Sequence, residues 1–228
     1  MGTPEGQSGY PRTVVMEREI PDATVARLPI YRRSLIELAS ADESTVSSAA
    51  LADLAGVNAA KVRKDLSYIG TTGVRGVGYD VKYLLREIGD ALGLDVEAPV
   101  LIVGMGNLGQ ALADYGGFGS RGFPVAALVD ASREKIGTEI AGMTIHGPDD
   151  LAELVREREV RIGIIATPAH AAQQVADDLV EAGIGSILSF APIVLHVPES
   201  VPVRKVDLAT ELQILSYYEQ REQDGKTA

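Results

Sequence analysis

The chain has 228 residues but no cysteine, no tryptophan and only 3 phenylalanines. Without cysteine the chain cannot form disulfides, cannot use a thiolate as a nucleophile, and cannot bind zinc or an iron–sulfur cluster through cysteine. Any redox chemistry would therefore need a bound cofactor. Few large aromatics beside 46% hydrophobic residues indicate cores of aliphatic side chains, which suits an α/β protein.

Long apolar runs are also missing. No stretch approaches the roughly 20 apolar residues that cross a bilayer, and the N-terminus lacks the basic start and apolar segment of a signal peptide. We therefore expect a cytoplasmic protein with no membrane partner. The length favours two domains, since domains usually have about 100 to 150 residues.

Negative charge dominates, with a formal net charge of −11, but it is unevenly spread. Residues 1–90 carry 11 Lys and Arg against 12 Asp and Glu, whereas residues 91–228 carry 10 against 20. Residues 61–86 have a local excess of positive charge. Because surface potentials decay over about 8 Å at physiological salt, such a segment can bind phosphate groups while the rest stays acidic. The net charge does not exclude DNA binding.

The first half of the chain has the pattern of a helix-turn-helix. Apolar spacing predicts one helix over residues 22–40, a second from Ser47 or Ser48 to Gly56, and a third over residues 59–68 capped by Asn58. Gly56 permits the tight turn between the last two. The third helix leaves five side chains for solvent or a partner, namely Lys61, Arg63, Lys64, Ser67 and Tyr68.

Residues 70–79 predict a small β-hairpin, here called the wing, because four glycines bracket β-branched residues and Arg75. An amphipathic helix follows, and the composition changes at Pro99. We therefore expect a flexible tail over residues 1–21, a winged helix domain over 22–97, a second domain over 98–206, and a C-terminal helix with a tail over 207–228.

The second domain alternates aliphatic strands with helices, which predicts a doubly wound parallel sheet of the Rossmann type. The C-terminal helix has an apolar stripe that nothing downstream can cover. The stripe consists of Leu208, Leu212, Leu215 and Tyr218, and a polar tail follows it.

A glycine motif follows the first strand of this domain and opens a helix, as Gly104-Met105-Gly106-Asn107-Leu108-Gly109. In a dinucleotide site the first glycine allows the turn, the second admits the pyrophosphate, and the third packs helix on strand. Asp130, 26 residues after Gly104, is placed to bind the adenosine ribose and to repel a 2′-phosphate, which favours NAD(H) over NADP(H). Arg133 is interpreted as a solvated helix residue. The alternative is a simple strand-to-helix turn with a solvated Asp130.

Catalytic candidates are few. We interpret His170 as an exposed residue in a helix's first turn and place His146 and His196 in loops, while Lys205 and Asp207 form no obvious acid–base pair. The residues after Pro99 are too few for a separate substrate domain. We predict no enzyme activity, no catalytic residue and no metal site. A small NAD-dependent oxidoreductase is the alternative, and a CoA-binding module is a third possibility.

After residue 22 nearly the whole chain resembles Rex, a family of bacterial NADH-responsive repressors. The resemblance implies a homodimer whose C-terminal helix is swapped into the partner, between its two domains. It also implies binding to an inverted-repeat operator in double-stranded DNA, release by NADH and competition by NAD+. The matching segments are residues 62–68, 75–79, 104–109, 114–115, 166–168, 190–192 and 206–208.

The resemblance also implies roles for single residues. The five exposed side chains of the third helix would lie at DNA, and Arg75 would reach it from the wing; the alternative is a solvated helix face. Asp207 would exchange partners between Arg33 and Tyr115 as the domains rotate, unless Tyr115 only packs and Arg33 is solvated. The residues expected at the nicotinamide are Tyr115, Thr167, Pro168, Phe190, Ala191 and Pro192.

Two features depart from the family pattern. Ile69 and Thr72 stand where aromatics are common, which puts the packing of the wing in doubt. Ser132 stands where a second acidic residue is often found, which affects only details of ribose binding.

Overall fold

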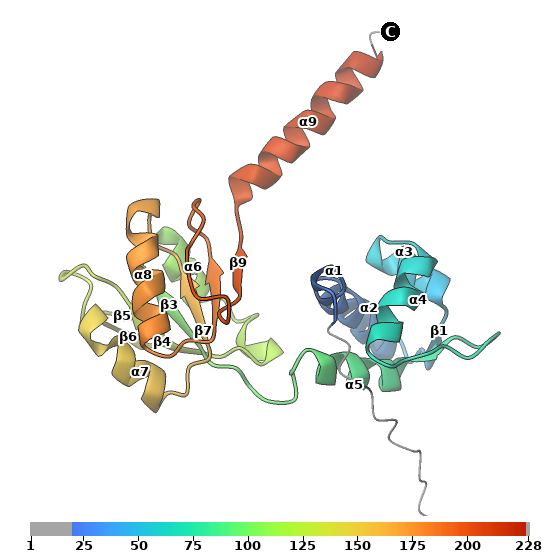
Figure 1. Ribbon diagram of the computed structural model, residues 1–228, viewed down its shortest axis with the longest axis horizontal. Coiled ribbons are helices and arrows are strands. Elements are labelled where there is room, and N and C mark those ends of the chain that lie inside the picture. Colours follow the sequence, from blue (N-terminus) through green and yellow to red (C-terminus); the bar gives the residue numbers. More distant parts are fainter. Residues whose placement is uncertain (1–19, 227–228) are drawn as a thin grey trace, which may run out of the picture. The chain divides into compact units, whose positions relative to one another are not determined.

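The computed structural model describes residues 20–226 (Figure 1). The predicted tail therefore lies outside the described residues, except for Ile20 and Pro21. The chain divides into two compact units between Asp95 and Val96, and each unit is described separately. Within residues 20–226, no helix combines the length and hydrophobicity that a bilayer span requires.

The first unit is a small helical domain with a two-stranded sheet. Its elements are α1 (Asp22–Val25), α2 (Leu28–Ser40), β1 (Thr45–Val46), α3 (Ser48–Ala55), α4 (Ala59–Tyr68), β2 (Tyr79–Asp80) and α5 (Val81–Ala91). The predicted starts of α3 and α4 are confirmed, because Ser47 and Asn58 cap them by accepting backbone N–H bonds of 3.0 Å and 2.8 Å. Gly56 ends α3 in the left-handed conformation, with a φ of 67°.

One prediction for this unit is wrong, and the predicted hairpin of the wing is shorter than expected. The single helix over residues 22–40 is two helices, because Pro29 in the first turn of α2 would clash with the carbonyl of Val25, where α1 ends. The wing forms only one isolated bridge, between Val74 and Gly78. β2 instead pairs with β1, a strand too short to show an alternating pattern.

A buried carboxylate joins the helices of the first unit. Asp65 of α4 is 1% exposed, although its neighbours Lys64 and Ser67 face solvent. It accepts hydrogen bonds from Arg27 Nε and Nη2 at 2.6 Å and 2.7 Å, from Tyr31 Oη at 2.7 Å and from Thr24 Oγ1 at 2.9 Å. This cluster ties α4 to α1 and α2 at the edge of the apolar core. The sequence did not predict it.

The second unit is built on a seven-stranded sheet of order β5-β6-β4-β3-β7-β8-β9. Six strands are parallel, and in chain order they follow the 3-2-1-4-5-6 sequence of the Rossmann fold. The strands are β3 (Val100–Val103), β4 (Val125–Val129), β5 (Glu139–Ile140), β6 (Met143–His146), β7 (Ile162–Ile165), β8 (Ser186–Ser189) and β9 (Val203–Lys205); the helices are α6 (Asn107–Ala113), α7 (Leu151–Glu157), α8 (Ala169–Glu181) and α9 (Leu208–Lys226).

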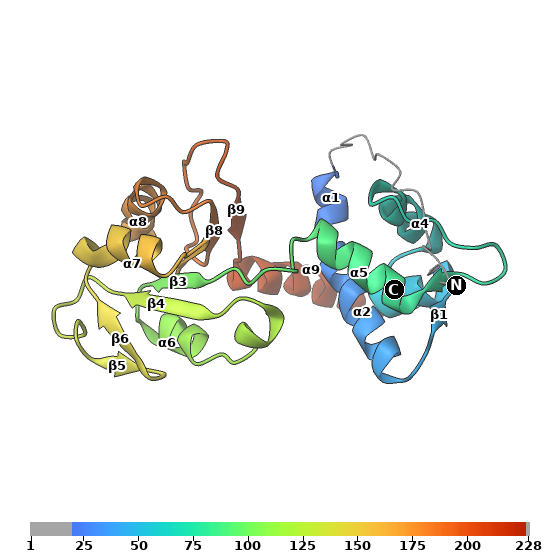
Figure 2. The same ribbon diagram turned by 90° about the horizontal axis from the view of Figure 1, so that it is seen from below.

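Helices cover both faces of this sheet. Leu101 and Val103 of β3 pack in one cluster with α7 and α8, whereas Val100 and Ile102 pack in a second cluster with α6. Figure 2 shows α7 and α8 on one side of the sheet and α6 on the other. The doubly wound prediction is confirmed.

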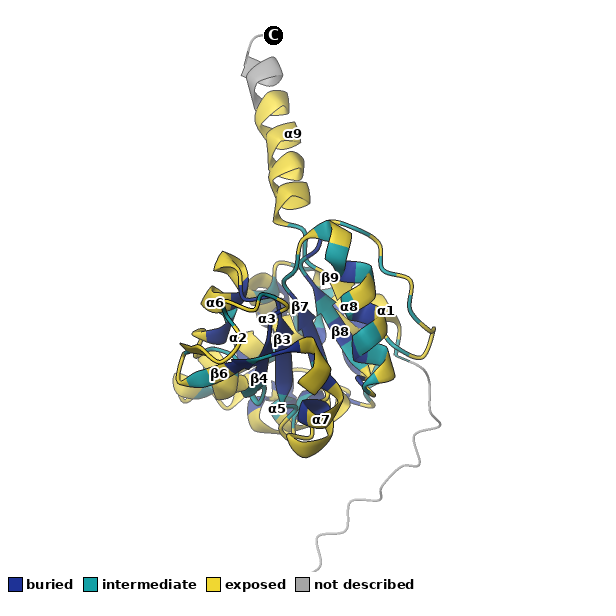
Figure 3. Ribbon diagram, turned by 90° about the vertical axis from the view of Figure 1, so that its left-hand side faces the viewer, coloured by how far each residue is buried: buried dark blue, intermediate teal, exposed yellow. Residues whose placement is uncertain are grey.

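Two predictions for the second unit need correction, and one hairpin was missed. The hairpin of β5 and β6 was not predicted, since its strands of two and four residues carry little periodic signal. His146 ends β6 instead of lying in a loop. Helix α9 continues to Lys226, beyond the start of the predicted polar tail, because Glu, Gln and Arg favour helix. Leu208 to Arg221 are all exposed (Figure 3).

Asp65→Asn should lower the free energy of unfolding of the first unit by about 3 kcal/mol, because it leaves Arg27 without its buried counter-charge. Urea unfolding followed by circular dichroism measures this, with the exposed Asp53→Asn as control. A loss below about 1 kcal/mol would contradict a structural role for the cluster.

The same cluster predicts a pH dependence. Burial by itself raises the pKa of Asp65, but hydrogen bonds from Arg27, Tyr31 and Thr24 outweigh it and hold the pKa below its ordinary value. The stabilisation is therefore complete above the unfolded pKa of about 3.9 and is lost as the pH falls through the lower, folded-state pKa. The unfolding free energy of wild type should fall more steeply below pH 4 than that of Asp65→Asn.

Candidate functional site

The glycine motif forms the loop between β3 and α6, at the carboxyl end of the sheet. Gly104 has a φ of +100°, and a Cβ there would lie 2.8 Å from the carbonyl oxygen of Ala166. A Cβ on Gly109 would overlap the carbonyl oxygen of Gly104. A Cβ on Gly106 would meet no described protein atom within 4 Å. The first and third glycines thus serve packing, while the second faces open space.

A cleft of about 740 Å³ opens beside this loop, between the ends of β3, β4 and β7 and helix α8. This is the switch point of the sheet, where ligands of open α/β folds bind. Some lining residues were not predicted, among them Lys135, Pro148 and Gln174. The predicted residues that line the cleft are Gly104, Gly106, Asn107, Leu108, Asp130, Thr167 and Pro168.

Thr167 contributes an unusual polar group to the cleft. Its Oγ1 atom is buried and has no hydrogen-bond partner among the described residues. Leaving a buried hydroxyl unpaired costs about 1 to 3 kcal/mol, so a ligand atom that bonds to it would remove this cost. Together with the space at Gly106, this hydroxyl fits a polar ligand lying along the loop.

Asp130 follows β4 and is 8% exposed. Its carboxylate accepts hydrogen bonds from the backbone N–H of Met105 at 2.7 Å, the N–H of Ser132 at 2.8 Å and Lys135 Nζ at 3.0 Å. Burial raises its pKa, but these donors together lower the pKa below the ordinary value. Asp130 is thus ionised and fastens the glycine loop to the end of β4.

Six predicted nucleotide residues do not line the cleft. Met105 is buried beneath the loop, and Gly109 packs α6 on it. Tyr115 is 48% exposed and packs edge-to-face on Phe118, 5.1 Å between ring centroids. The other three follow β8, where Phe190 is half-buried, Ala191 buried and Pro192 exposed.

The predicted DNA residues gather on α4 and the wing. Lys61, Arg63, Lys64 and Ser67 are exposed and Tyr68 is half-buried. Ser67 Oγ donates to the carbonyl of Lys64 at 2.6 Å, so it also serves its own helix. These side chains lie on the side of α4 opposite the buried Val62 and Leu66.

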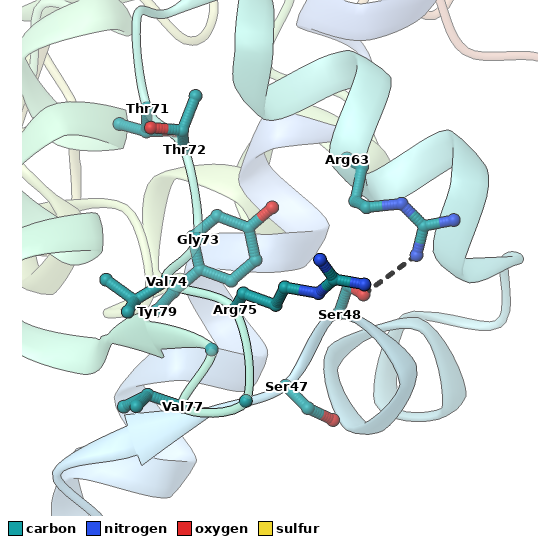
Figure 4. Close-up of a pocket in the computed structure, with 12 residues that line it drawn as sticks. Ser47, Ser48, Arg63, Thr71, Thr72, Gly73, Val74, Arg75, Val77 and Tyr79 are labelled. Carbon is teal, nitrogen blue, oxygen red and sulfur yellow. Dashed lines mark hydrogen bonds between the residues drawn. The ribbon is translucent and has the colours of Figure 1, made fainter.

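A groove of about 500 Å³ separates the wing from α3 and α4 and is lined by Arg63 and Arg75 (Figure 4). Arg63 Nη1 donates to Ser48 Oγ at 3.0 Å, which orients the guanidinium from the first turn of α3. A groove carrying two arginines suits an anionic backbone.

The three predicted switch residues lie in different elements. Asp207 caps α9 by accepting the N–H of Thr210 at 3.2 Å, and Lys205 Nζ lies 3.1 Å away. The hydrogen bond from Lys205, with that from Thr210, lowers the pKa of Asp207. Arg33 is exposed on α2 of the first unit. Asp207 is therefore paired within its own segment in this structure, and its exchange between Arg33 and Tyr115 remains a prediction.

No group of three or more His, Asp or Glu side chains in the described part of the chain could hold a metal ion. His170 is exposed and lines the cleft.

Comparisons with known proteins identify relatives over both units. A family described as "Putative DNA-binding protein N-terminus" matches residues 19–67, and one described as "CoA binding domain" matches residues 95–193. The redox-sensing transcriptional repressor Rex of Streptomyces coelicolor is 57% identical over 95% of this chain and 84% of its own length. Rex of Roseiflexus is 48% identical over 88% of this chain and 91% of its own length.

Solved structures of RSP, a Rex-family repressor, are also similar. RSP in complex with NAD+ and operator DNA has a TM-score of 0.84 and 36% identity, over 91% of this chain and 96% of its own. RSP in complex with NADH has a TM-score of 0.81 and 34% identity, over 92% and 98%.

The different surroundings of the glycines predict different stabilities. Gly109→Ala should lower the melting temperature of the second unit by several degrees, because its Cβ would overlap the Gly104 carbonyl. Gly106→Ala should leave the melting temperature unchanged within about 1 °C. Differential scanning calorimetry of both variants checks this, and equal melting temperatures would contradict the packing described here.

Proposed function

The chain belongs to the Rex family of redox-sensing transcriptional repressors, and from this membership we propose that it binds an inverted-repeat operator as a homodimer and dissociates when NADH binds. Double-stranded DNA and a second copy of the chain are then its partners. NADH and NAD+ are its ligands and are not consumed, so the protein is not an enzyme. A repressor of bacterial genes acts in the cytoplasm.

The cleft beside the glycine loop is the observation that carries this proposal. Gly106 leaves room for a pyrophosphate, and the unpartnered Thr167 hydroxyl can bond to it or to the adjoining ribose. A bound dinucleotide would supply the redox signal through the state of its nicotinamide. Thr167 and Pro168, which line the cleft, would border that ring. Tyr115, Phe190, Ala191 and Pro192, which lie outside the cleft, would complete its surroundings.

The exposed face of α4 and the wing would hold the operator. Lys61, Arg63 and Lys64 offer positive charge on the helix that follows the Gly56 turn, as in a recognition helix. Ser67 and Tyr68 continue this face, and Arg75 extends it along the groove. A two-fold dimer would place two such faces on the two halves of an inverted repeat.

The exposed stripe of α9 supports the dimer. Leu208, Leu212, Leu215 and Tyr218 are 58% to 66% exposed. Large apolar side chains in one stripe typically mark an interface. Insertion of α9 into the partner, as the family resemblance implies, would bury them.

Asp207 would couple the ligand to this interface. Asp207 is bound at present by Lys205 and by the N–H of Thr210. Both interactions lie at the surface, where such bonds are weak and can be replaced by others. A shift of Asp207 toward Arg33 in one state and Tyr115 in the other would bias two arrangements of the domains.

Fluorescence anisotropy of a labelled inverted-repeat duplex tests the proposed function, at one fixed salt concentration. NADH should release the duplex at concentrations at least tenfold below those needed for NAD+. Gly106→Val should bind the duplex normally and ignore NADH, because its side chain would fill the space left for the ligand. Tight NADH binding without DNA binding would favour the oxidoreductase alternative. Release of the duplex by CoA but not by NADH would favour a CoA-binding function, in line with the family that matches residues 95–193.

Arg63→Ala should weaken operator binding at least fivefold, since one groove contact is worth about 1 to 3 kcal/mol. Its affinity for NADH and its melting temperature should not change, because the side chain is exposed. The matched control is Arg86→Ala, an exposed arginine on α5 outside the predicted DNA face. Equal losses in both variants would mean that overall charge, not the α4 face, determines binding.

A further inference from the structure

We propose that Lys135 binds a hydroxyl group of the adenosine ribose. In the usual dinucleotide site the acidic residue at the end of the second strand binds the ribose hydroxyls by itself, whereas here Asp130 and Lys135 would share them. The inference rests on the proposed dinucleotide function and concerns how the cleft recognises the hydroxyl groups of that ribose.

Most of the hydrogen-bonding capacity of Asp130 is already used within the protein. A carboxylate offers about four acceptor positions, and Asp130 already uses three of them. Oδ2 accepts from Met105 N–H and Lys135 Nζ, and Oδ1 accepts from Ser132 N–H. Its side chain is only 11% exposed. Asp130 therefore has capacity for about one ribose hydroxyl, not for the usual pair.

Lys135 has the capacity that Asp130 lacks. An ammonium group carries three donors, and one of them points to Asp130 at 3.0 Å. Its side chain is 38% exposed and lines the cleft, where it is the only lysine or arginine among the lining residues. The remaining donors can bond to the oxygen of a ribose hydroxyl at the end of β4.

Local structure explains how Lys135 comes to this position. The N–H groups of Lys135 and Ile136 both donate to the carbonyl of Ser132, at 3.0 Å and 3.1 Å. This single turn folds the chain back, so that Lys135 reaches the carboxylate five residues before it. Arg133 occupies the same turn but is exposed and does not line the cleft. Arg133 is therefore a matched control for charge.

The pair also changes the charge at this end of the cleft. A carboxylate alone presents a net negative charge, whereas Asp130 and Lys135 at 3.0 Å are neutral together. A neutral pair with one acceptor and two free donors suits a hydroxyl group, which both donates and accepts.

The first test measures NADH affinity by isothermal titration calorimetry for wild type, Lys135→Met and Arg133→Met. Lys135→Met should weaken NADH binding about tenfold, the lower range for a charge-assisted hydrogen bond, and Arg133→Met less than twofold. Melting temperatures should stay within about 2 °C, since the Lys135 side chain is partly exposed and Asp130 keeps the N–H bonds of Met105 and Ser132 in the variant. No loss in Lys135→Met, or an equal loss in Arg133→Met, would overturn the inference.

A second test separates direct contact from an effect passed through Asp130. It repeats the titrations with NADH analogues whose adenosine ribose lacks the 2′-hydroxyl or the 3′-hydroxyl. If Lys135 binds a hydroxyl, the tenfold loss should shrink to less than about threefold for one analogue. The same loss for NADH and both analogues would assign Lys135 to positioning Asp130 and refute the contact.

These outcomes are distinguishable from a failure of the proposed function. Wild type that binds no NADH would refute dinucleotide binding itself. Wild type that binds NADH tightly, with Lys135→Met unaffected, would refute only the role of Lys135.

Discussion

Asp65 is the group on which the architecture of the first unit depends. Helix α4 turns its cationic side chains to solvent and packs Val62 and Leu66 in the core. The carboxylate turns inward, and the bidentate bonds from Arg27 fix both the depth and the rotation of α4. A buried ion pair of this kind adds geometric definition more reliably than net stability. The orientation of the exposed cations follows from it.

Asp130 has a comparable place in the second unit. It holds the N–H of Met105 at the centre of the glycine loop, while its partner Lys135 comes from the next turn of chain. The loop is thus fixed before any ligand arrives, which reduces the ordering cost of binding. In both units a buried aspartate therefore holds in place the segment that would contact a ligand.

This arrangement bears on how a ligand could control DNA binding. A ligand shifts an equilibrium only by its differential affinity for the two states, so rigid sites need a separate element that moves. In the function proposed above, Asp207 and α9 would be that element. The helix is exposed over the residues whose side chains are described, and Asp207 is held by two replaceable bonds.

Much of the fold could be predicted from the sequence, because its signals are local. Caps such as Ser47 and Asn58, and the aliphatic strand of residues 100–103, act within a few residues of themselves. The two-residue strands β1 and β2 could not be predicted, since so short a segment becomes a strand only when a distant partner pairs with it. The same holds for the break between α1 and α2, where one proline overrode an otherwise continuous apolar pattern.

For the sites, the sequence by itself determined the glycine motif, the basic face of α4 and the strand-end position of Asp130, because residue type and spacing carry that information. Only the tertiary structure decided that Asp65 points inward and that Lys135 faces the cleft while Arg133 does not. It also decided that Gly106 faces open space whereas Gly109 packs against Gly104. Two neighbouring cations, or two glycines of one motif, look equivalent in the sequence. Their roles differ because the folded chain places different atoms around each of them.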